Sequence, residues 1–173
     1  QYHRIQTRFE EDGRYLPNLV NREFIKDEKD YPIAGCFDSA FEFLERNRTH
    51  DNWLLHLECF DPHEPFTAPA RYRERYPTDY RGPILDWPKY ERLRESPQEV
   101  AELRANYAAL VTMCDAYLGR LLDYFDAHDL WRDTALVLTT DHGFLLGEHD
   151  WWAKNRCPMF NEFRHLPLVV YHP

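Results

Sequence analysis

The sequence predicts an α/β fold, namely a doubly wound, mostly parallel sheet with flanking helices that is incomplete in this chain. Two observations predict it. Apolar runs typical of strands alternate with a segment of helical periodicity, in the order strand, helix, strand. The run 135–138 is continuously apolar, as in a strand covered on both faces, and the chain then turns polar at Asp141 and His142. Ligands of open α/β sheets bind just beyond such strand ends.

The first elements follow from hydrophobic periodicity. Residues 1–33 are polar and aromatic without a clear period, which predicts a loop with a short hairpin. A strand is expected at 53–60, because the apolar run there ends at Asp61-Pro62. Residues 36–47 are expected to form a helix, because one helical face would carry Phe37, Ala40, Phe41 and Leu44.

The clearest element is a helix from Ser96 to about residue 127. Serine at the cap, Pro97 at the first helical position and Glu99 three residues after the serine form a strong start signal. Asp115 interrupts the apolar stripe of this helix, and we expect a buried, hydrogen-bonded structural carboxylate there. The stripe itself comprises Val100, Leu103, Tyr107, Leu110, Val111, Cys114, Leu118, Leu121, Leu122 and Phe125.

The remaining segments are a long connection and two strands. Residues 61–95 are rich in proline and charge and look too irregular for a core element, so we expect a functional or mobile connection. Strands are predicted at 134–140 and 166–171, and the alternation with helices indicates parallel pairing. Three strands are too few to cover the apolar helix faces, which indicates a missing portion of the sheet.

Composition limits the classes of function. The chain has 173 residues, enough for one domain with a core, and 43% of them are hydrophobic. Its 21 basic and 30 acidic residues give a net charge of −9 without a basic stripe, so nucleic acid and anionic membranes are unlikely partners. No apolar run is long enough for a membrane span. A small anionic substrate is compatible with this net charge, because it needs only local positive charge. The sequence does not indicate the oligomeric state.

The cysteines suggest free thiols. The two in expected helices and the one in the expected strand have no closely spaced partner, so buried free thiols are predicted. Nothing in this pattern demands an oxidising compartment, so the compartment stays open, with the cytoplasm slightly favoured over the periplasm or secretion. The cysteines are Cys36, Cys59, Cys114 and Cys157.

Asp141 and His142 are candidate ligands of a divalent metal ion. A carboxylate oxygen beside an imidazole nitrogen, on backbone fixed by a strand, supplies half of such a site. Gly143 adds no side chain and lets the chain turn away. The alternative is an ordinary Asp-His-Gly turn, in which the aspartate caps the next segment.

His63 and Lys154 are the other candidates. His63 follows the expected strand 53–60 between prolines and would emerge at the same sheet edge as Asp141 if the two strands are parallel. It could bind an oxyanion or protonate a leaving group, or be a surface histidine in a proline-rich turn. Lys154 follows two tryptophans, and its ammonium could bind a sulfuryl or phosphoryl oxygen, or its stem could pack on the indoles. Arg156 and Arg164 are weaker candidates for the same role.

Taken together, metal donors, an imidazole and a cation at strand ends indicate a hydrolytic site for a compact anionic group. The sequence from residue 36 to 173 resembles the sulfatases of the alkaline phosphatase superfamily. The motifs that carry the resemblance are Asp61-Pro-His-Glu-Pro-Phe66, Cys114-Asp-Ala-Tyr-Leu-Gly-Arg-Leu-Leu122, Thr139-Thr-Asp-His-Gly143, Gly147-Glu-His149, Lys154 and Leu166-Pro-Leu-Val169.

The resemblance implies roles for these residues. Asp141 and His142 match two ligands of a single divalent ion, commonly calcium, with magnesium or manganese as alternatives. Lys154 matches a lysine that contacts the sulfate, and His63 matches a histidine near the leaving-group oxygen. The substrate would be a small sulfate ester, attacked by a hydrated formylglycine.

The chain departs from the family pattern at the nucleophile. None of its cysteines lies in the motif that yields formylglycine, and the paired amino-terminal aspartates are missing. We therefore expect residues 1–173 to be a partial sulfatase catalytic domain whose nucleophile segment lies upstream, and which alone does not turn over substrate. The rivals are a phosphodiesterase or phosphonate monoester hydrolase of the same superfamily, and a non-catalytic binding module.

Overall fold

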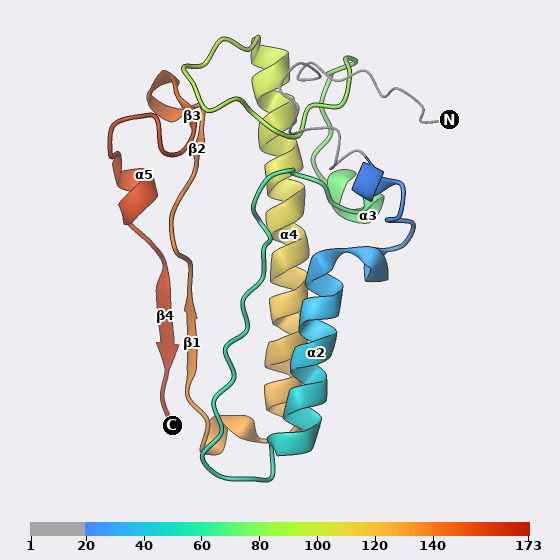
Figure 1. Ribbon diagram of the computed structural model, residues 1–173, viewed down its shortest axis with the longest axis vertical. Coiled ribbons are helices and arrows are strands. Elements are labelled where there is room, and N and C mark those ends of the chain that lie inside the picture. Colours follow the sequence, from blue (N-terminus) through green and yellow to red (C-terminus); the bar gives the residue numbers. More distant parts are fainter. Residues whose placement is uncertain (1–19) are drawn as a thin grey trace.

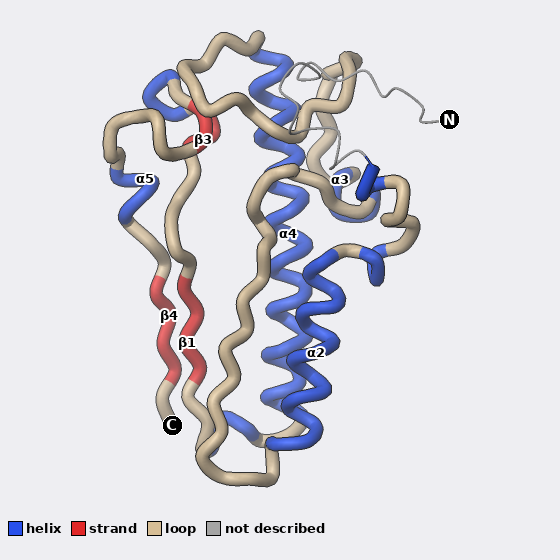
Figure 2. Tube along the Cα trace, in the orientation of Figure 1, coloured by secondary structure: helices blue, strands red, loops and turns tan. Residues whose placement is uncertain are grey.

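The fold is organised around one long helix. The computed structural model describes residues 20–173, and in Figure 1 helix α4 (Pro97–Ala127) runs along most of its length. Helix α2 (Pro32–Asn47) lies beside the second half of α4, and strands β1 (Leu136–Thr139) and β4 (Leu168–Tyr171) form a separate layer. Figure 2 shows that loops make up much of the rest.

Helix α4 confirms the strongest prediction from the sequence. The Ser96 side chain accepts a hydrogen bond from the Glu99 backbone N–H, and the Glu99 side chain accepts one from the Ser96 N–H, which forms a capping box. Asp115 differs from the prediction, because it is exposed rather than buried. The apolar stripe of α4 is broad, and the part of it around Asp115 faces solvent in this chain. Buried residues of α4 include Leu103, Leu110, Met113, Tyr117, Leu121 and Phe125.

Helix α2 confirms the helix predicted at 36–47 and begins earlier, with Pro32 in the first turn, a position where proline suits a helix. Its apolar face packs on α4, where the Phe37 and Tyr117 rings lie 5.4 Å apart. The hairpin predicted within 1–33 falls partly outside the described residues. Residues 20–33 contain no strand; they hold a helical turn at 20–22 and the 3-10 helix η2 (Glu28–Asp30).

The strand predicted at 53–60 is not formed within residues 20–173, although the segment runs as an extended trace in Figure 1. Their burial alternates: every second residue from Trp53 to Cys59 is partly buried, whereas Leu54 and Phe60 are exposed. This alternation is the period of a β-strand with one covered face. The segment rises in the same direction as β1 in Figure 1, so both lead toward the same end of the molecule.

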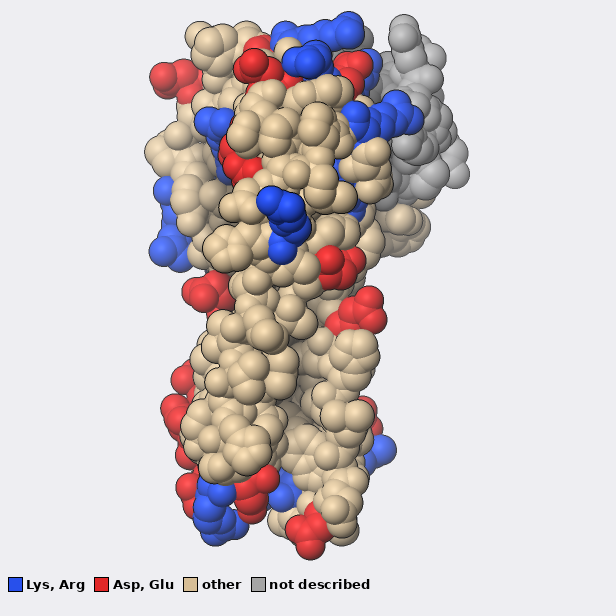
Figure 3. All heavy atoms as spheres, turned by 90° about the vertical axis from the view of Figure 1, so that its left-hand side faces the viewer, with Lys and Arg blue, Asp and Glu red and all other residues tan. Residues whose placement is uncertain are grey.

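Strands β1 and β4 are both present, but the predicted parallel arrangement is wrong for this pair. They pair antiparallel, with Leu136 opposite Tyr171 and Thr139 opposite Leu168. The physical reason is the connection between them, which holds only short elements and turns back instead of crossing over through a helix. The expected cover is also missing, because Val137 and Leu168 are 60% and 67% exposed. Figure 3 shows a face with few charged side chains through its middle.

The connection between β1 and β4 contains a second small sheet. Strand β2 (Leu145–Leu146) pairs antiparallel with β3 (Trp152–Ala153), and the 3-10 helix η4 (Glu148–Asp150) joins them. Helix α5 (Asn161–Arg164) follows. Leu145, Trp152 and Ala153 are all buried, so this hairpin is anchored in the hydrophobic core.

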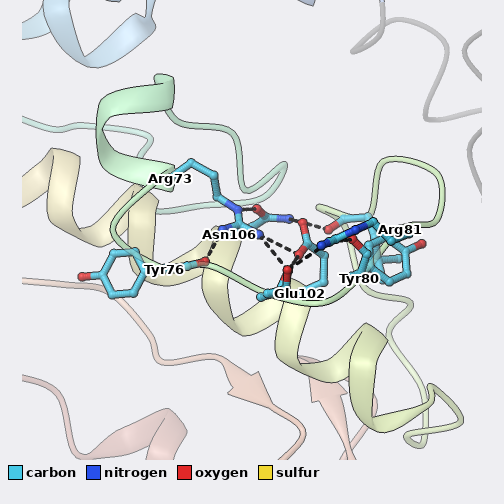
Figure 4. Close-up of polar contacts among 8 residues, drawn as sticks. Arg73, Tyr76, Tyr80, Arg81, Glu102 and Asn106 are labelled. Atoms are coloured by element: carbon cyan, nitrogen blue, oxygen red, sulfur yellow. Dashed lines mark hydrogen bonds and ion pairs between the residues drawn. The ribbon is translucent and has the colours of Figure 1, made fainter.

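The proline-rich connection 61–95 contributes to the core, contrary to the prediction. It contains helix α3 (Ala70–Arg73) and buries Phe66, Tyr72 and Leu85. A polar network fixes it to α4 (Figure 4). Within this network Arg73 donates to Asn106 Oδ1 at 2.6 Å and to Glu102 Oε2 at 2.6 Å. Asn106 in turn donates to the Leu85 carbonyl at 2.8 Å.

The four cysteines are free and half-buried. The sulfur atoms of Cys36 and Cys59 lie 3.6 Å apart, and burial raises the pKa of both Cys59 and Cys114 to about 12. The cysteines are thus free, as predicted, but they are only partly buried and not fully buried as expected. None of the helices within residues 20–173 is long and apolar enough to cross a membrane.

Candidate active site

Asp141 and His142 lie just past the end of β1, where the polypeptide leaves the sheet. Asp141 Oδ1 accepts a hydrogen bond from the His142 backbone N–H at 3.0 Å, and Asp141 Oδ2 lies 3.7 Å from His142 Nε2. Slight desolvation raises the pKa of Asp141, but the His142 ring, hydrogen bonds and Lys154 outweigh it and leave the pKa below its ordinary value. The carboxylate is thus ionised at neutral pH and exposed to incoming cations.

The tautomer of His142 follows from its neighbours. Its Nδ1 lies 2.9 Å from the Gly143 carbonyl oxygen. A carbonyl oxygen can only accept, so Nδ1 carries the proton and Nε2 of the neutral ring keeps a lone pair. That lone pair is the donor that a metal ion would use.

Lys154 meets His142 despite the distance between them in the sequence. Its Nζ lies 3.0 Å from His142 Nε2, and the residue is only 8% exposed. The β2–β3 hairpin explains the contact: Leu145 pairs with Ala153, which returns the chain to the Asp141–Gly143 turn. The two tryptophans before Lys154 contact other residues. Trp152 Nε1 donates to Glu95 Oε2 at 2.7 Å, and the Arg92 guanidinium lies over the Trp151 ring.

The backbone around Lys154 is strained. Ala153 and Asn155, on either side of it, have φ values of 65° and 72°, in the left-handed region that is costly for residues with a side chain. Ala153 is completely buried, so packing of the hairpin holds this conformation. The lysine is therefore placed by rigid surroundings and not by a flexible loop.

Gly143 is required by close packing. A Cβ atom at this position would lie 1.6 Å from the Glu162 carbonyl oxygen, and the Gly143 N–H donates to the Phe163 carbonyl at 3.1 Å. The turn after His142 thereby rests directly on α5. The expectation that Gly143 only lets the chain turn away was incomplete, because the contact with α5 depends on long-range packing.

His63 lies in the loop that follows the extended segment 53–60. Its ring stacks on Phe60 with centroids 4.3 Å apart, and its side chain is 30% exposed. The same loop contacts the turn after β1, because the rings of Phe66 and Phe144 lie 5.5 Å apart. Asp61, two residues before His63, is partly buried, and desolvation raises its pKa to about 6.

The sequence did not single out two acidic residues that the structure distinguishes. Glu64 is completely buried beside His63, and the signal for it was an acid between a candidate histidine and a proline. Glu162 pairs with His149, whose Nε2 lies 3.1 Å from Glu162 Oε1 and whose ring stacks on Phe160 at 3.9 Å. His149 was left unassigned from sequence, and no local signal connects it to Glu162.

The donor set supports a divalent cation, but as half of a site. Asp141 offers carboxylate oxygens and His142 a neutral nitrogen, which both suit such an ion. Residues 20–173 contain no cluster of three or more histidine, cysteine, aspartate or glutamate side chains arranged to hold a metal. Further ligands would have to come from elsewhere, since calcium takes about six to eight oxygens.

Known proteins have a similar fold and similar sequences. The solved phosphonate monoester hydrolase SpPMH from Silicibacter pomeroyi superposes with a TM-score of 0.63 over 98% of this chain and 43% of that chain, at 22% identity. The chain therefore has part of an alkaline phosphatase-like fold. The family profile described as Sulfatase matches residues 3–172, and the chain belongs to the sulfatase family.

Curated relatives agree. Iduronate 2-sulfatase of Homo sapiens is 28% identical over 203 residues, which cover 100% of this chain and 36% of that protein. The multifunctional alkaline phosphatase superfamily protein PehA of Trinickia caryophylli is 29% identical over 168 residues, covering 77% of this chain and 32% of that protein. The chain thus spans about a third of the length of the curated relatives it matches.

Proposed function

We propose that the protein containing this chain hydrolyses a sulfate ester, and that the chain supplies the later half of the active site. The observation that carries the proposal is the buried Lys154, whose Nζ lies 3.0 Å from His142 Nε2. The same His142 nitrogen lies 3.7 Å from Asp141 Oδ2, just past the end of a strand. Membership of the sulfatase family supports the same reaction.

Asp141 and His142 are the proposed metal ligands in this chain. Calcium is the expected ion, with magnesium or manganese as alternatives. When bound, such an ion polarises the ester oxygens and neutralises charge that develops on them. The remaining ligands and the formylglycine nucleophile are proposed to come from a segment outside this chain.

Lys154 is proposed to bind a sulfate oxygen. A buried ammonium must be compensated by an anion or a hydrogen-bond acceptor, and here it has the neutral ring of His142. A sulfate oxygen is a stronger partner, because it is anionic. His63 is proposed to face the leaving group and to donate a proton to the oxygen that departs.

We further infer a larger, mostly parallel sheet in the whole protein. Residues 53–60 and β1 run in the same direction, and both leave apolar side chains exposed. Additional strands between or beside them would bury those side chains and complete the hydrogen bonding of the extended segment.

Two substitutions test the proposal in the full-length protein. Asp141→Asn should lower bound metal and activity together, because a carboxylate ligand is lost. Lys154→Ala should lower kcat/KM about 10²- to 10³-fold with metal retained, as for loss of one oxyanion-binding donor. The measurements are elemental analysis and sulfate release from an aryl sulfate.

Exposed residues provide matched controls: Asp79→Asn and Lys29→Ala should leave both readouts unchanged. Unchanged metal content in Asp141→Asn removes that residue from the metal site. Metal loss in Lys154→Ala contradicts the role given to the lysine.

The second candidate is hydrolysis of a phosphate diester or a phosphonate monoester. The structural likeness to a phosphonate monoester hydrolase and the relation to PehA favour it. Parallel assays with aryl sulfate, bis-aryl phosphate and phenylphosphonate esters separate the two. Faster turnover of the phosphorus esters would replace the sulfatase assignment, and absence of any turnover would favour a non-catalytic binding role.

A further inference from the structure

Glu64 is an unusual residue in this protein. It is 0% exposed, and neither carboxylate oxygen accepts a hydrogen bond from any group within residues 20–173. The other fully buried acid, Asp86, is 3% exposed and forms an ion pair with Arg22. A buried carboxylate without compensation costs several kcal/mol, so its position requires a partner.

The partner within the described residues is His63. Its Nδ1 lies 3.3 Å from Glu64 Oε2. Among residues 20–173, His63 is the one cation-forming side chain within ion-pair distance of the Glu64 carboxylate. The same Nδ1 lies 2.8 Å from the Glu64 backbone carbonyl oxygen. Glu64 thus presents two acceptors to His63 Nδ1, namely its carboxylate Oε2 and its backbone carbonyl oxygen.

This arrangement determines which nitrogen of His63 remains for chemistry. Both neighbours of Nδ1 are acceptors, so Nδ1 carries a proton and points inward. Nε2 makes no hydrogen bond to residues 20–173, and the side chain is 30% exposed. The outward nitrogen is therefore the one that can meet a ligand.

We propose that Glu64 is a positioning residue that holds the His63 ring with Nδ1–H directed inward and Nε2 directed to the leaving-group oxygen of the ester. The inference rests on the proposed function. In the reaction the oxygen of the formylglycine nucleophile forms a bond to sulfur while the bond between sulfur and the leaving oxygen breaks. The leaving oxygen keeps the electron pair of that bond and takes the proton from Nε2 of His63. The two acceptors of Glu64 beside Nδ1 fix the orientation of the ring beforehand, as acceptors behind a histidine ring commonly do.

The surroundings of His63 contain one other acid. Asp61 is partly buried and interacts electrostatically with the ring, and Phe60 covers one ring face. Glu64 differs from Asp61 in its complete burial and its direct approach to Nδ1. Substitution of each acid separately therefore distinguishes their contributions.

The test is Glu64→Gln in the full-length protein, with Glu58→Gln as the matched control. Glu58 is an exposed glutamate on the preceding extended segment. We expect the ring nitrogen signals of His63 in histidine-labelled NMR spectra to change in Glu64→Gln only, because the ring loses the acceptor that fixes its orientation.

Leaving-group dependence gives a second readout. General acid catalysis contributes about 10²- to 10⁴-fold, so partial loss should slow esters of weakly acidic alcohols about tenfold or more. Aryl sulfates with strongly acidic phenols need little protonation and should be nearly unaffected. A merely structural residue would slow all esters alike.

Glu64→Leu is a second variant for the case in which Glu64→Gln does not fold. Replacement of a buried charge by an apolar side chain of similar size is often neutral or stabilising. Unchanged His63 ring signals and an unchanged leaving-group dependence in both folded variants overturn the inference. If the wild-type protein releases no sulfate but the NMR shift appears, the Glu64–His63 coupling holds and the sulfatase function fails.

Discussion

Single residues in this chain acquire their properties from neighbours that are distant in sequence. Lys154 is buried because the β2–β3 hairpin returns it to His142. His142 presents the Nε2 lone pair to Lys154 because its Nδ1 faces the Gly143 carbonyl oxygen. The sequence alone predicts these residues as candidates for a site and leaves a purely structural role open for each. Their proposed roles follow from these contacts.

Asp61 yields a prediction at this scale. Desolvation raises its pKa to about 6, so the folded protein releases the proton later than the unfolded chain, whose aspartates titrate near 4. Stability due to Asp61 is therefore present below about pH 4 and lost as pH rises to about 6. Since the side chain keeps some contact with water, Asp61→Asn should be about 1 to 2 kcal/mol more stable than wild type at pH 7 and equal to it near pH 4.

Urea unfolding between pH 4 and pH 7 measures this difference. Asp79→Asn, at an exposed position in the same connection, should follow the wild type throughout. If Asp61→Asn and wild type have parallel stability curves, the carboxyl group is not desolvated as the structure indicates.

At the scale of elements, local signals and packing act together. The start of α4 was predictable because Ser96, Pro97 and Glu99 encode the cap within four residues. The strand 53–60 was predictable as an extended segment but not as a paired one, since pairing depends on a neighbour. The antiparallel direction of β4 was not predictable from its own residues.

The capping box gives a prediction for α4. Ser96→Ala removes the acceptor for the Glu99 N–H and should lower the free energy of unfolding by about 1 kcal/mol. Ser39→Ala in α2 is the control, because Ser39 bonds back to the Gly35 carbonyl within the helix and is exposed. That change should be neutral or slightly stabilising, as alanine is the better helix former. Equal losses in the two variants would argue against a specific capping effect.

At the scale of the whole molecule, the sheet layer is the least covered part. Val169 and Val170 are 55% and 59% exposed, and the face around them carries few charges through its middle (Figure 3). Contiguous apolar surface of this kind usually meets other protein surface. The helical side is different, because α2 and α4 bury their facing side chains.

This difference predicts how the isolated chain behaves. A chain of residues 1–173 produced alone should bind the dye ANS and associate with increasing concentration, because the β1 and β4 face is uncovered. The full-length protein should bind much less dye per molecule if additional strands or helices cover that face. Fluorescence titration and sedimentation measure the two effects, and equal dye binding by both proteins would contradict a covered face.

The sequence by itself determined the two long helices, the extended segments at 53–60, 134–140 and 166–171, and the positions of His63, Asp141 and His142 just past the ends of the first two segments. Those features depend on periodicity, caps and turns, which are local. Only the tertiary structure decided that β4 runs antiparallel to β1, that Lys154 touches His142 and that Glu64 is buried against His63. These depend on which surfaces pack together, because direction, contact and burial are properties of segments that are far apart in the chain.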